Sequence, residues 1–233
     1  MRGKIWIYPL LLMGLILLFT FGCEDENNPD NQPTTVTDID GNVYNTVTIG
    51  TQVWMKENLK VTRYRNGEAI PLVTDSIAWS CLSTSAYCSY DNSTTQSNIY
   101  GYLYNWYAVN DSRNIAPEGW HVPSDYEWTQ LIDYLGGTTV AGGKMKVTGL
   151  TYWAAPNTGA TNESNFSALP GGYRYPADGV FYLIGKGGYW WSNTVGPDII
   201  SNAWMSSAIY NNTHAPLYYY DKRHGYSVRC VKD

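Results

Sequence analysis

The stretch Gly187–Thr194, with the sequence GGYWWSNT, places three large aromatic side chains side by side. Neighbouring side chains of a β-strand point to opposite faces, so Trp190 and Trp191 leave such a strand on different sides. In one alternative, loops cover the second face and both rings are core residues, one beneath each layer. In the other, one ring forms an exposed platform on which a sugar can stack. Both alternatives predict a strand at residues 187–194.

Two further strands are predicted near the start of the domain. Along residues 43–49, apolar residues alternate with others, and this period of two indicates a strand. A Gly-Thr turn follows, and residues 52–55 return as the second strand. The preceding sequence DIDGN, residues 38–42, predicts a turn, although its acidic spacing also allows a structural calcium ion.

The clearest helix begins after residue 123. Ser124 and Glu127 have the spacing of a capping box, in which each side chain binds a backbone N–H at the helix start. The apolar residues that follow form one stripe at i, i+3, i+4 and i+7, which we assign to the core: Trp128, Leu131, Ile132 and Leu135. Two glycines at 136–137 end the helix.

Beyond residue 142, short strands alternate with loops rich in Gly, Asn and Pro, and no second long helix is predicted. The fold class is therefore α+β. We expect a loop-rich, twisted antiparallel sheet with one or two packed helices.

The first 22 residues have the layout of a secretory signal peptide. Arg2 and Lys4 precede an apolar run over residues 5–21, which is followed by Gly22 and Cys23. A cysteine in this position is where a bacterial lipoprotein is cleaved and acylated, so we expect Cys23 to carry a lipid that contacts the membrane. An uncleaved anchor helix and secretion without a lipid are the alternatives.

A tether and one domain are predicted to follow the signal. Residues 23–36 are acidic and polar, which indicates a disordered tether, and residues 37–233 form the domain. This organisation predicts a lipid-anchored protein at the outer membrane or the cell surface.

The composition argues against nucleic acid as a partner. The chain has 15 Lys and Arg against 20 Asp and Glu, a net charge of −5, and no extended basic cluster. The 21 Tyr and 10 Trp are instead typical of extracytoplasmic binding domains.

Three cysteines besides Cys23 are available for one disulfide in an oxidising compartment. Cys81 and Cys88 are spaced to close a short loop. Alternatively, one of them, such as Cys88, bridges to Cys230 near the C-terminus. Neither the cysteines nor the three scattered histidines predict a metal site.

No catalytic residue is predicted, because the chain lacks the sequence motifs of serine hydrolases, P-loop proteins and zinc proteases. Asp125 and Glu127 suit the dipole of a helix N-terminus, and His121 suits a structural hydrogen bond. The candidate ligand-binding residues are Trp190, Trp191, Arg174 and Asn193. For Arg174, the alternative is that its guanidinium ties loops together through backbone carbonyls.

Several motifs, in order, resemble the Fibrobacter succinogenes major paralogous domain over about Thr37 to Asp233. The family's members are typically lipoproteins or secreted proteins of Bacteroidetes and Fibrobacteres. The motifs are DIDGNVYNTVTIGTQVWMKENLK, YGYLYNWYAV, PEGWHVPSDYEWTQL, GGKMK, SNFSALPGGYR, GGYWWSNT and GYSVRCVKD.

A more distant likeness links WHVPSDYEWTQL, GGYWWS and GYSVRC to the formylglycine-generating sulfatase-modifying domains. This resemblance implies a C-type-lectin-like fold whose termini lie close together. Those enzymes hold copper with two closely spaced cysteines, but the matching stretch here has no cysteine before Cys230. The resemblance therefore favours a non-catalytic binding or adhesion module for glycan or protein. An enzyme acting on extracellular glycan and a structural envelope protein are the alternatives.

Overall fold

The computed structural model describes residue 3 and residues 34–197 and 201–233. The predicted signal peptide and lipidation site, Cys23, lie outside the described residues. Strand β1 begins at Thr35, inside the segment that was predicted to be a tether, so the folded domain begins slightly earlier than residue 37. Within the described part of the chain, every helix is too short or too polar to cross a bilayer.

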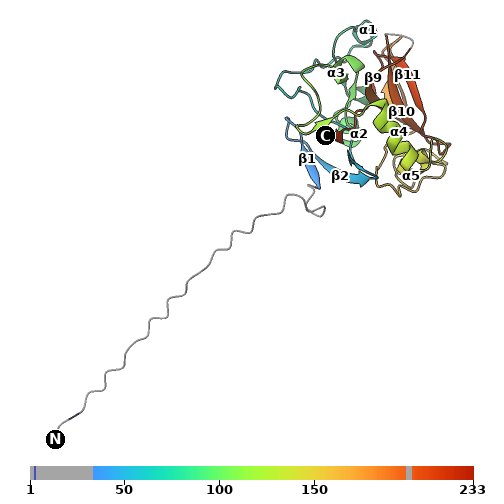
Figure 1. The fold of residues 1–233 in the computed structure, drawn as a ribbon. Coiled ribbons are helices and arrows are strands. Elements are labelled where there is room, and N and C mark those ends of the chain that lie inside the picture. The colour runs from blue at the N-terminus through green and yellow to red at the C-terminus, as the bar shows by residue number, and fades with distance from the viewer. Residues whose placement is uncertain (1–2, 4–33, 198–200) are drawn as a thin grey trace. The chain divides into compact units, whose positions relative to one another are not determined.

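The described strands form four antiparallel sheets, in which β2 and β3 confirm the two strands predicted at 43–49 and 52–55. The largest sheet has the order β1-β2-β3-β12-β6, and the next has the order β11-β10-β9. Strands β9, β10 and β11 lie together in Figure 1. The other two sheets pair β4 with β5 and β7 with β8. The strands are β1 (Thr35–Thr37), β2 (Val43–Ile49), β3 (Gln52–Met55), β4 (Tyr87–Cys88), β5 (Leu103–Tyr104), β6 (Trp120–His121), β7 (Gly171–Arg174), β8 (Phe181–Ile184), β9 (Gly187–Val195), β10 (Asn202–Ile209), β11 (Leu217–Asp221) and β12 (Val231–Lys232).

The predicted helix is α4, Asp125–Tyr134, and both hydrogen bonds of its capping box between Ser124 and Glu127 are present. The described residues contain more helices than the one or two expected, but the others have seven residues or fewer. They are α1 (Ser76–Ser80), the 3-10 helix η2 (Tyr90–Asn92), α2 (Thr94–Tyr100), α3 (Trp106–Val109) and α5 (Ala141–Met145). The domain is thus of the mixed α+β class.

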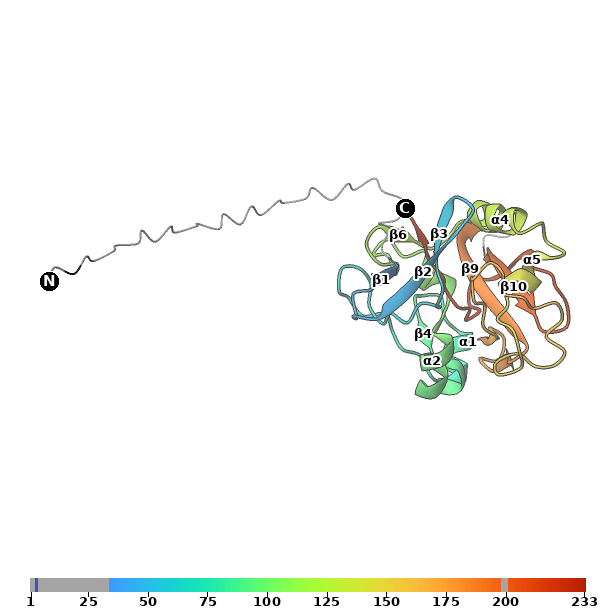
Figure 2. The ribbon, with the colours of Figure 1, turned by 90° about the horizontal axis from the view of Figure 1, so that it is seen from below.

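The five-stranded sheet joins segments from opposite ends of the domain. Val231 of β12 pairs with Trp54 of β3 on one side and with His121 of β6 on the other. Seen from below, the N-terminal strands lie beside the C-terminal end of the chain (Figure 2).

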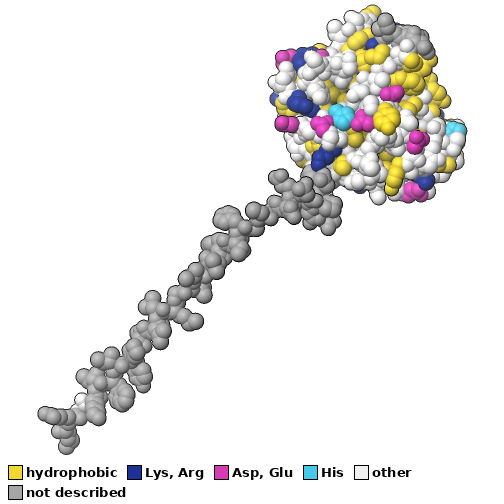
Figure 3. Space-filling view, viewed as in Figure 1, with side chains coloured by type: hydrophobic (Ala, Val, Ile, Leu, Met, Phe, Trp, Pro, Cys, Tyr) yellow, Lys and Arg dark blue, Asp and Glu magenta, His cyan; other side chains and the backbone are white. Residues whose placement is uncertain are grey.

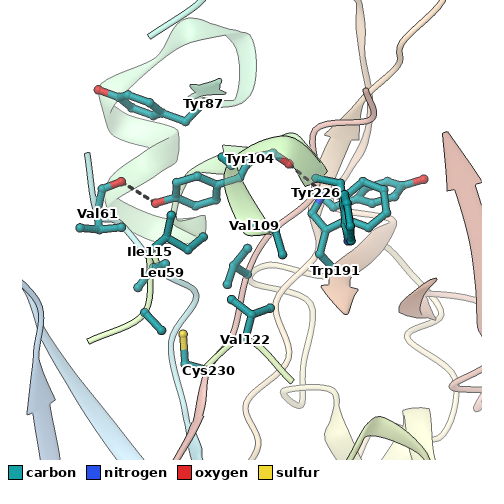
Figure 4. Packing of buried hydrophobic residues seen from close by; sticks show 14 of the residues in the cluster. Leu59, Val61, Tyr87, Tyr104, Val109, Ile115, Val122, Trp191, Tyr226 and Cys230 are labelled. Carbon is teal, nitrogen blue, oxygen red and sulfur yellow. Dashed lines mark hydrogen bonds between the residues drawn. The ribbon is translucent and has the colours of Figure 1, made fainter. Parts of the chain in front are cut away.

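Strand β9 separates two hydrophobic cores, and each core receives one tryptophan of the pair. Trp191 packs on Tyr226, with ring centroids 4.6 Å apart, and its Nε1 donates to the Tyr104 carbonyl (Figure 4). Trp190 packs in the other core, 6.2 Å from the ring of Trp128 on α4. Both tryptophans have no exposed surface, so the structure adopts the buried alternative.

A buried polar hub connects β9 to the C-terminal segment. Asn58 Oδ1 accepts hydrogen bonds from Trp190 Nε1 at 2.8 Å and from Arg229 Nη2 at 2.9 Å. Arg229 has no exposed surface, and its Nη1 donates to the Phe166 carbonyl. Burial lowers the pKa of Arg229 to about 9, which still leaves the guanidinium charged at neutral pH. Asn58 is therefore the side-chain acceptor for a buried charge.

The predicted disulfide is not formed, because Cys81, Cys88 and Cys230 are all free thiols. Cys88 lies in a small cluster with Trp79 and Leu103, whereas Cys230 lies in the core that contains Trp191. Cys81 is exposed at the end of α1. Burial raises the pKa of the Cys88 thiol to about 12, as expected for an unreactive core cysteine.

Candidate functional site

An open cleft of about 450 Å³ lies beside the three-stranded sheet and is lined mainly by aromatic side chains. We call it the tyrosine cleft, and its aromatic lining residues are Tyr173, Tyr175, Tyr189, Tyr220, His224 and Tyr226. Hydrophobic side chains, among which the figure includes tyrosine, gather at the margin of the surface beside β11 (Figure 3). The cleft itself presents mainly aromatic surface.

Strand periodicity brings the tyrosines of the cleft to one surface. Tyr173 on β7 and Tyr175 just beyond it are two residues apart and therefore share a face. Tyr189 comes from β9 and Tyr220 from the edge strand β11. The loop that contains Gly225 is held against β7 by two backbone hydrogen bonds between Arg174 and Gly225. Strands of two sheets and the loop that contains Gly225 therefore form the walls and floor of the cleft.

His224 lies at the centre of these rings. Its ring stacks on Tyr226 at a centroid distance of 5.0 Å and an interplanar angle of 19°. It lies 5.5 Å from Tyr175 and 5.6 Å from Tyr220, the two tyrosines on either side of the cleft. Burial among these rings lowers the pKa of His224 to about 4, so the imidazole is neutral at neutral pH. The Nδ1 atom lies 3.0 Å from the Asp221 carbonyl, which assigns the single ring proton to Nδ1 and leaves Nε2 as an acceptor.

Most of the polar atoms in the cleft have no partner in the protein. None of the five lining phenol groups has a hydrogen-bond partner among residues 34–197 and 201–233, and neither has His224 Nε2. Tyr226 and His224 are only 3% and 6% exposed and form the floor of the cleft, but their unpaired polar atoms are not among the fully buried unpaired atoms of the described residues and so still reach solvent. Tyr175 and Tyr220 are 39% and 44% exposed and present ring surface at its sides. Solvent-accessible polar groups without a protein partner, next to open aromatic surface, are typical of a binding site.

The two charged side chains of the cleft bind each other. Arg223 Nη2 lies 2.6 Å from Asp221 Oδ2, and Arg223 Nε lies 3.0 Å from Asp221 Oδ1. Arg223 Nη1 also donates to the Ser80 carbonyl at 2.9 Å. The hydrogen bonds from Arg223 hold the pKa of Asp221 below its usual value even though burial opposes this shift. The pair therefore leaves the cleft without net charge.

The sequence-predicted ligand residues do not form a surface site. Trp190 and Trp191 are core residues, and the fully buried Arg174 donates to the carbonyls of Gly179, Val73 and Thr74. Arg174 therefore ties loops together, which was the structural alternative for this residue. Asn193 is half-buried at the start of α4, where its N–H donates to the Pro123 carbonyl. None of the four lines the tyrosine cleft, although Tyr189 of the same GGYWWSNT stretch does.

Sequence reasoning missed the cleft, although a signal was present. Tyrosines two residues apart, such as Tyr173 and Tyr175 or Tyr218 and Tyr220, share a face of an extended chain. Two such pairs in the C-terminal part of one domain indicate an aromatic surface. The pairing of strands that brings the two pairs together is not visible in either segment alone.

His121 is a structural residue that links α4 to β12. Its Nε2 lies 2.7 Å from Glu127 Oε1, and its Nδ1 lies 2.6 Å from Asp233 Oδ1. The hydrogen bond to Glu127, followed by that to Asp233, raises the pKa of His121 against the opposing effect of burial. Both ring nitrogens are thus occupied by protein carboxylates.

The DIDGN segment forms a turn that Asp38 stabilises. The Asp38 carboxylate accepts hydrogen bonds from Asn42 N at 2.9 Å and from the Tyr44 hydroxyl at 2.6 Å. No group of three His, Cys, Asp or Glu side chains suited to a metal ion occurs in the described part of the chain.

Another cavity, of about 510 Å³, lies beside α3, but its charged side chains, Asp111 and Arg113, are paired with each other. Arg113 binds Asp111 through Nε at 2.8 Å and Nη2 at 2.7 Å, and its Nη1 binds Glu68. The tyrosine cleft is the better candidate because its polar atoms are unpaired.

Comparison with known proteins supports the family and adds no curated relative. No curated protein and no solved structure matches the chain significantly. The sequence model of the Fibrobacter succinogenes major domain, however, matches residues 47–232, which include every strand from β3 to β12 and the whole tyrosine cleft. This chain therefore belongs to the Fibrobacter succinogenes major domain family.

Proposed function

We propose that this protein is a surface-exposed bacterial lipoprotein whose domain binds an extracellular glycan in the tyrosine cleft without catalysing a reaction. The observation that carries this proposal is the set of unpaired phenol and imidazole atoms beside exposed tyrosine rings. Sugar rings stack on aromatic faces, and sugar hydroxyls both donate and accept hydrogen bonds. The cleft offers both kinds of contact within one open surface.

The composition of the cleft favours holding a glycan over hydrolysing it. Most glycosidases use two carboxyl groups, one on each side of the bond that is cleaved. Among the residues that line the tyrosine cleft, the one carboxylate is Asp221, and Arg223 binds it through two nitrogens. An enzyme that acts on extracellular glycan is the alternative, and turnover of a bound glycan would favour it.

We further propose that the domain has a C-type-lectin-like fold. Loop-rich sheets support this assignment, as does a central sheet in which β12 lies between β3 and β6. Glycan binding in this proposal uses the tyrosines and needs no metal ion.

Alanine substitution of either exposed tyrosine at the side of the cleft should weaken glycan binding about 5- to 30-fold. Tyr175→Ala and Tyr220→Ala each remove a ring that is partly exposed, and loss of such a contact costs about 1 to 2 kcal/mol of binding free energy. The measurement is a glycan array with full-length protein in detergent, followed by calorimetry on the glycans retained.

The matched control is Tyr126→Ala, since Tyr126 is 67% exposed on α4 and does not line the cleft. This variant should bind like the wild type. Retention of no glycan by folded protein would contradict glycan binding and leave a protein ligand. Equal binding by all three variants would place the glycan site outside the cleft.

Lipid attachment is tested at Cys23. Wild-type protein expressed in a bacterial host should incorporate labelled palmitate and sediment with membranes, whereas Cys23→Ala should lose the label. Cys81→Ala is the control, because Cys81 is an exposed thiol of the folded domain. Continued labelling of Cys23→Ala would overturn the anchor.

A further inference from the structure

The charge of the tyrosine cleft bears on the kind of glycan that it accepts. The binding of an acidic sugar requires a cation that is not already neutralised. Arg223 directs Nε and Nη2 to Asp221 and Nη1 to Ser80, so its charge is matched inside the protein. Among the described residues, no lysine lines the cleft, and His224 is neutral. The domain therefore offers no free cation there for a carboxylate or sulfate.

The unpaired groups of the cleft are all neutral. They are the five phenols, His224 Nε2 and the side-chain amide nitrogen of Asn202, whose Oδ1 accepts from Ser201 at 3.4 Å. A phenol donates and accepts, the amide nitrogen donates, and His224 Nε2 accepts. Hydroxyl groups satisfy all three kinds of partner, and a carboxylate, which only accepts, cannot satisfy Nε2.

The residues at the floor of the cleft strengthen the preference for hydroxyl groups over acidic groups. Tyr226 and His224 are buried to more than nine-tenths and stack on each other, so neither ring can turn to avoid a mismatched ligand. A ligand acceptor that faces Nε2 would shield this nitrogen from solvent without forming a hydrogen bond, which costs about 1 to 3 kcal/mol. An acidic group that reaches the floor would meet this penalty at Nε2.

We infer that the tyrosine cleft binds an uncharged polysaccharide, whose hydroxyl groups meet Tyr226 and His224 while its ring faces stack on Tyr175 and Tyr220. This inference rests on the glycan-binding function proposed above. Uronate, sulfated and sialylated glycans should bind more weakly, because no unpaired cation of the described lining residues faces their acidic groups.

The experiment compares glycans that differ in charge alone. Full-length protein in detergent is titrated with fully methyl-esterified polygalacturonan and with polygalacturonate, and is screened against neutral and sulfated galactans, all at 50 and 500 mM NaCl. The expected result is retention of neutral glycans with a dissociation constant that changes less than two-fold with salt.

Variants that keep an aromatic ring test the polar atoms of the floor. Tyr226→Phe deletes the phenol oxygen, and His224→Phe deletes Nε2 together with the Nδ1–H that donates to the Asp221 carbonyl. Each should weaken the binding of a neutral glycan about five- to ten-fold. Tyr126→Phe is the control and should have no effect. Circular dichroism melting identifies any variant that has not folded.

The outcomes separate the inference from the proposed function. Three results would overturn the inference and leave glycan binding standing. The first is preferential retention of uronate or sulfated glycans, and the second is equal affinity for the neutral and the acidic member of a glycan pair. The third is wild-type affinity of both His224→Phe and Tyr226→Phe. Retention of no glycan by the folded protein would overturn both.

Discussion

Replacing Asn58 by leucine is expected to lower the free energy of unfolding by about 3 to 5 kcal/mol. Asn58 is 5% exposed, and its Oδ1 is the side-chain acceptor for both Arg229 and the Trp190 indole. Leucine fills a similar volume but leaves the guanidinium charge buried with one fewer acceptor. Urea unfolding followed by tryptophan fluorescence measures this change.

A double-mutant cycle tests the cause of that loss. If the penalty comes from the stranded charge, Asn58→Leu combined with Arg229→Leu should lose at least about 1 kcal/mol less than the two single changes added together. Asn66→Leu is the control at an exposed asparagine and should change stability by no more than about 0.5 kcal/mol. Strict additivity in the cycle would show that Asn58 and Arg229 act independently.

Acidification is expected to destabilise the protein through His224. Because folding lowers the His224 pKa from 6.5 to about 4, the unfolded chain binds the proton more readily over this interval. The stability that comes from a neutral His224 is therefore complete above about pH 6.5 and is lost as the pH falls toward 4. The full shift corresponds to about 3 kcal/mol. Urea unfolding at pH 7 and at pH 4 measures the difference.

His224→Phe isolates this contribution, since phenylalanine keeps an aromatic ring and cannot take up a proton. The variant should lose about 3 kcal/mol less than the wild type between pH 7 and pH 4, whatever its stability at pH 7. Asp221, the nearest acid, has a lowered pKa and titrates below the interval. His214→Phe is the control at an exposed histidine and should follow the wild type. Parallel pH curves for wild type and His224→Phe would refute the assignment.

Local patterns predicted the regular elements of this fold well. The alternation over residues 43–49 identified β2, and the capping box identified the start of α4, because both signals depend on neighbours in the chain. Which side chains of β2 point into the core was less predictable. Tyr44 is fully buried and Val43 is 59% exposed, since the Tyr44 hydroxyl is satisfied by Asp38 inside the core.

The site was less predictable than the elements. The Trp190–Trp191 pair indicated a two-faced strand, but whether loops cover its second face depends on Tyr226 and Tyr104, which are distant in sequence. The tyrosine cleft likewise depends on β7, β9 and β11 meeting the loop around His224. Such contacts depend on tertiary packing, and the periodic spacing of apolar residues within one segment does not reveal them.

The position of β12 between β3 and β6 has a consequence for the timing of folding. The hairpin of β2 and β3 can form as soon as residue 55 has been synthesised. The strand that pairs with the other edge of β3 is β12, which contains Val231. A chain that is synthesised from its N-terminus therefore has an unpaired β3 edge until nearly all of the domain has been made. Contacts over such separations slow folding, so the nascent chain needs protection from edge-to-edge aggregation in that interval.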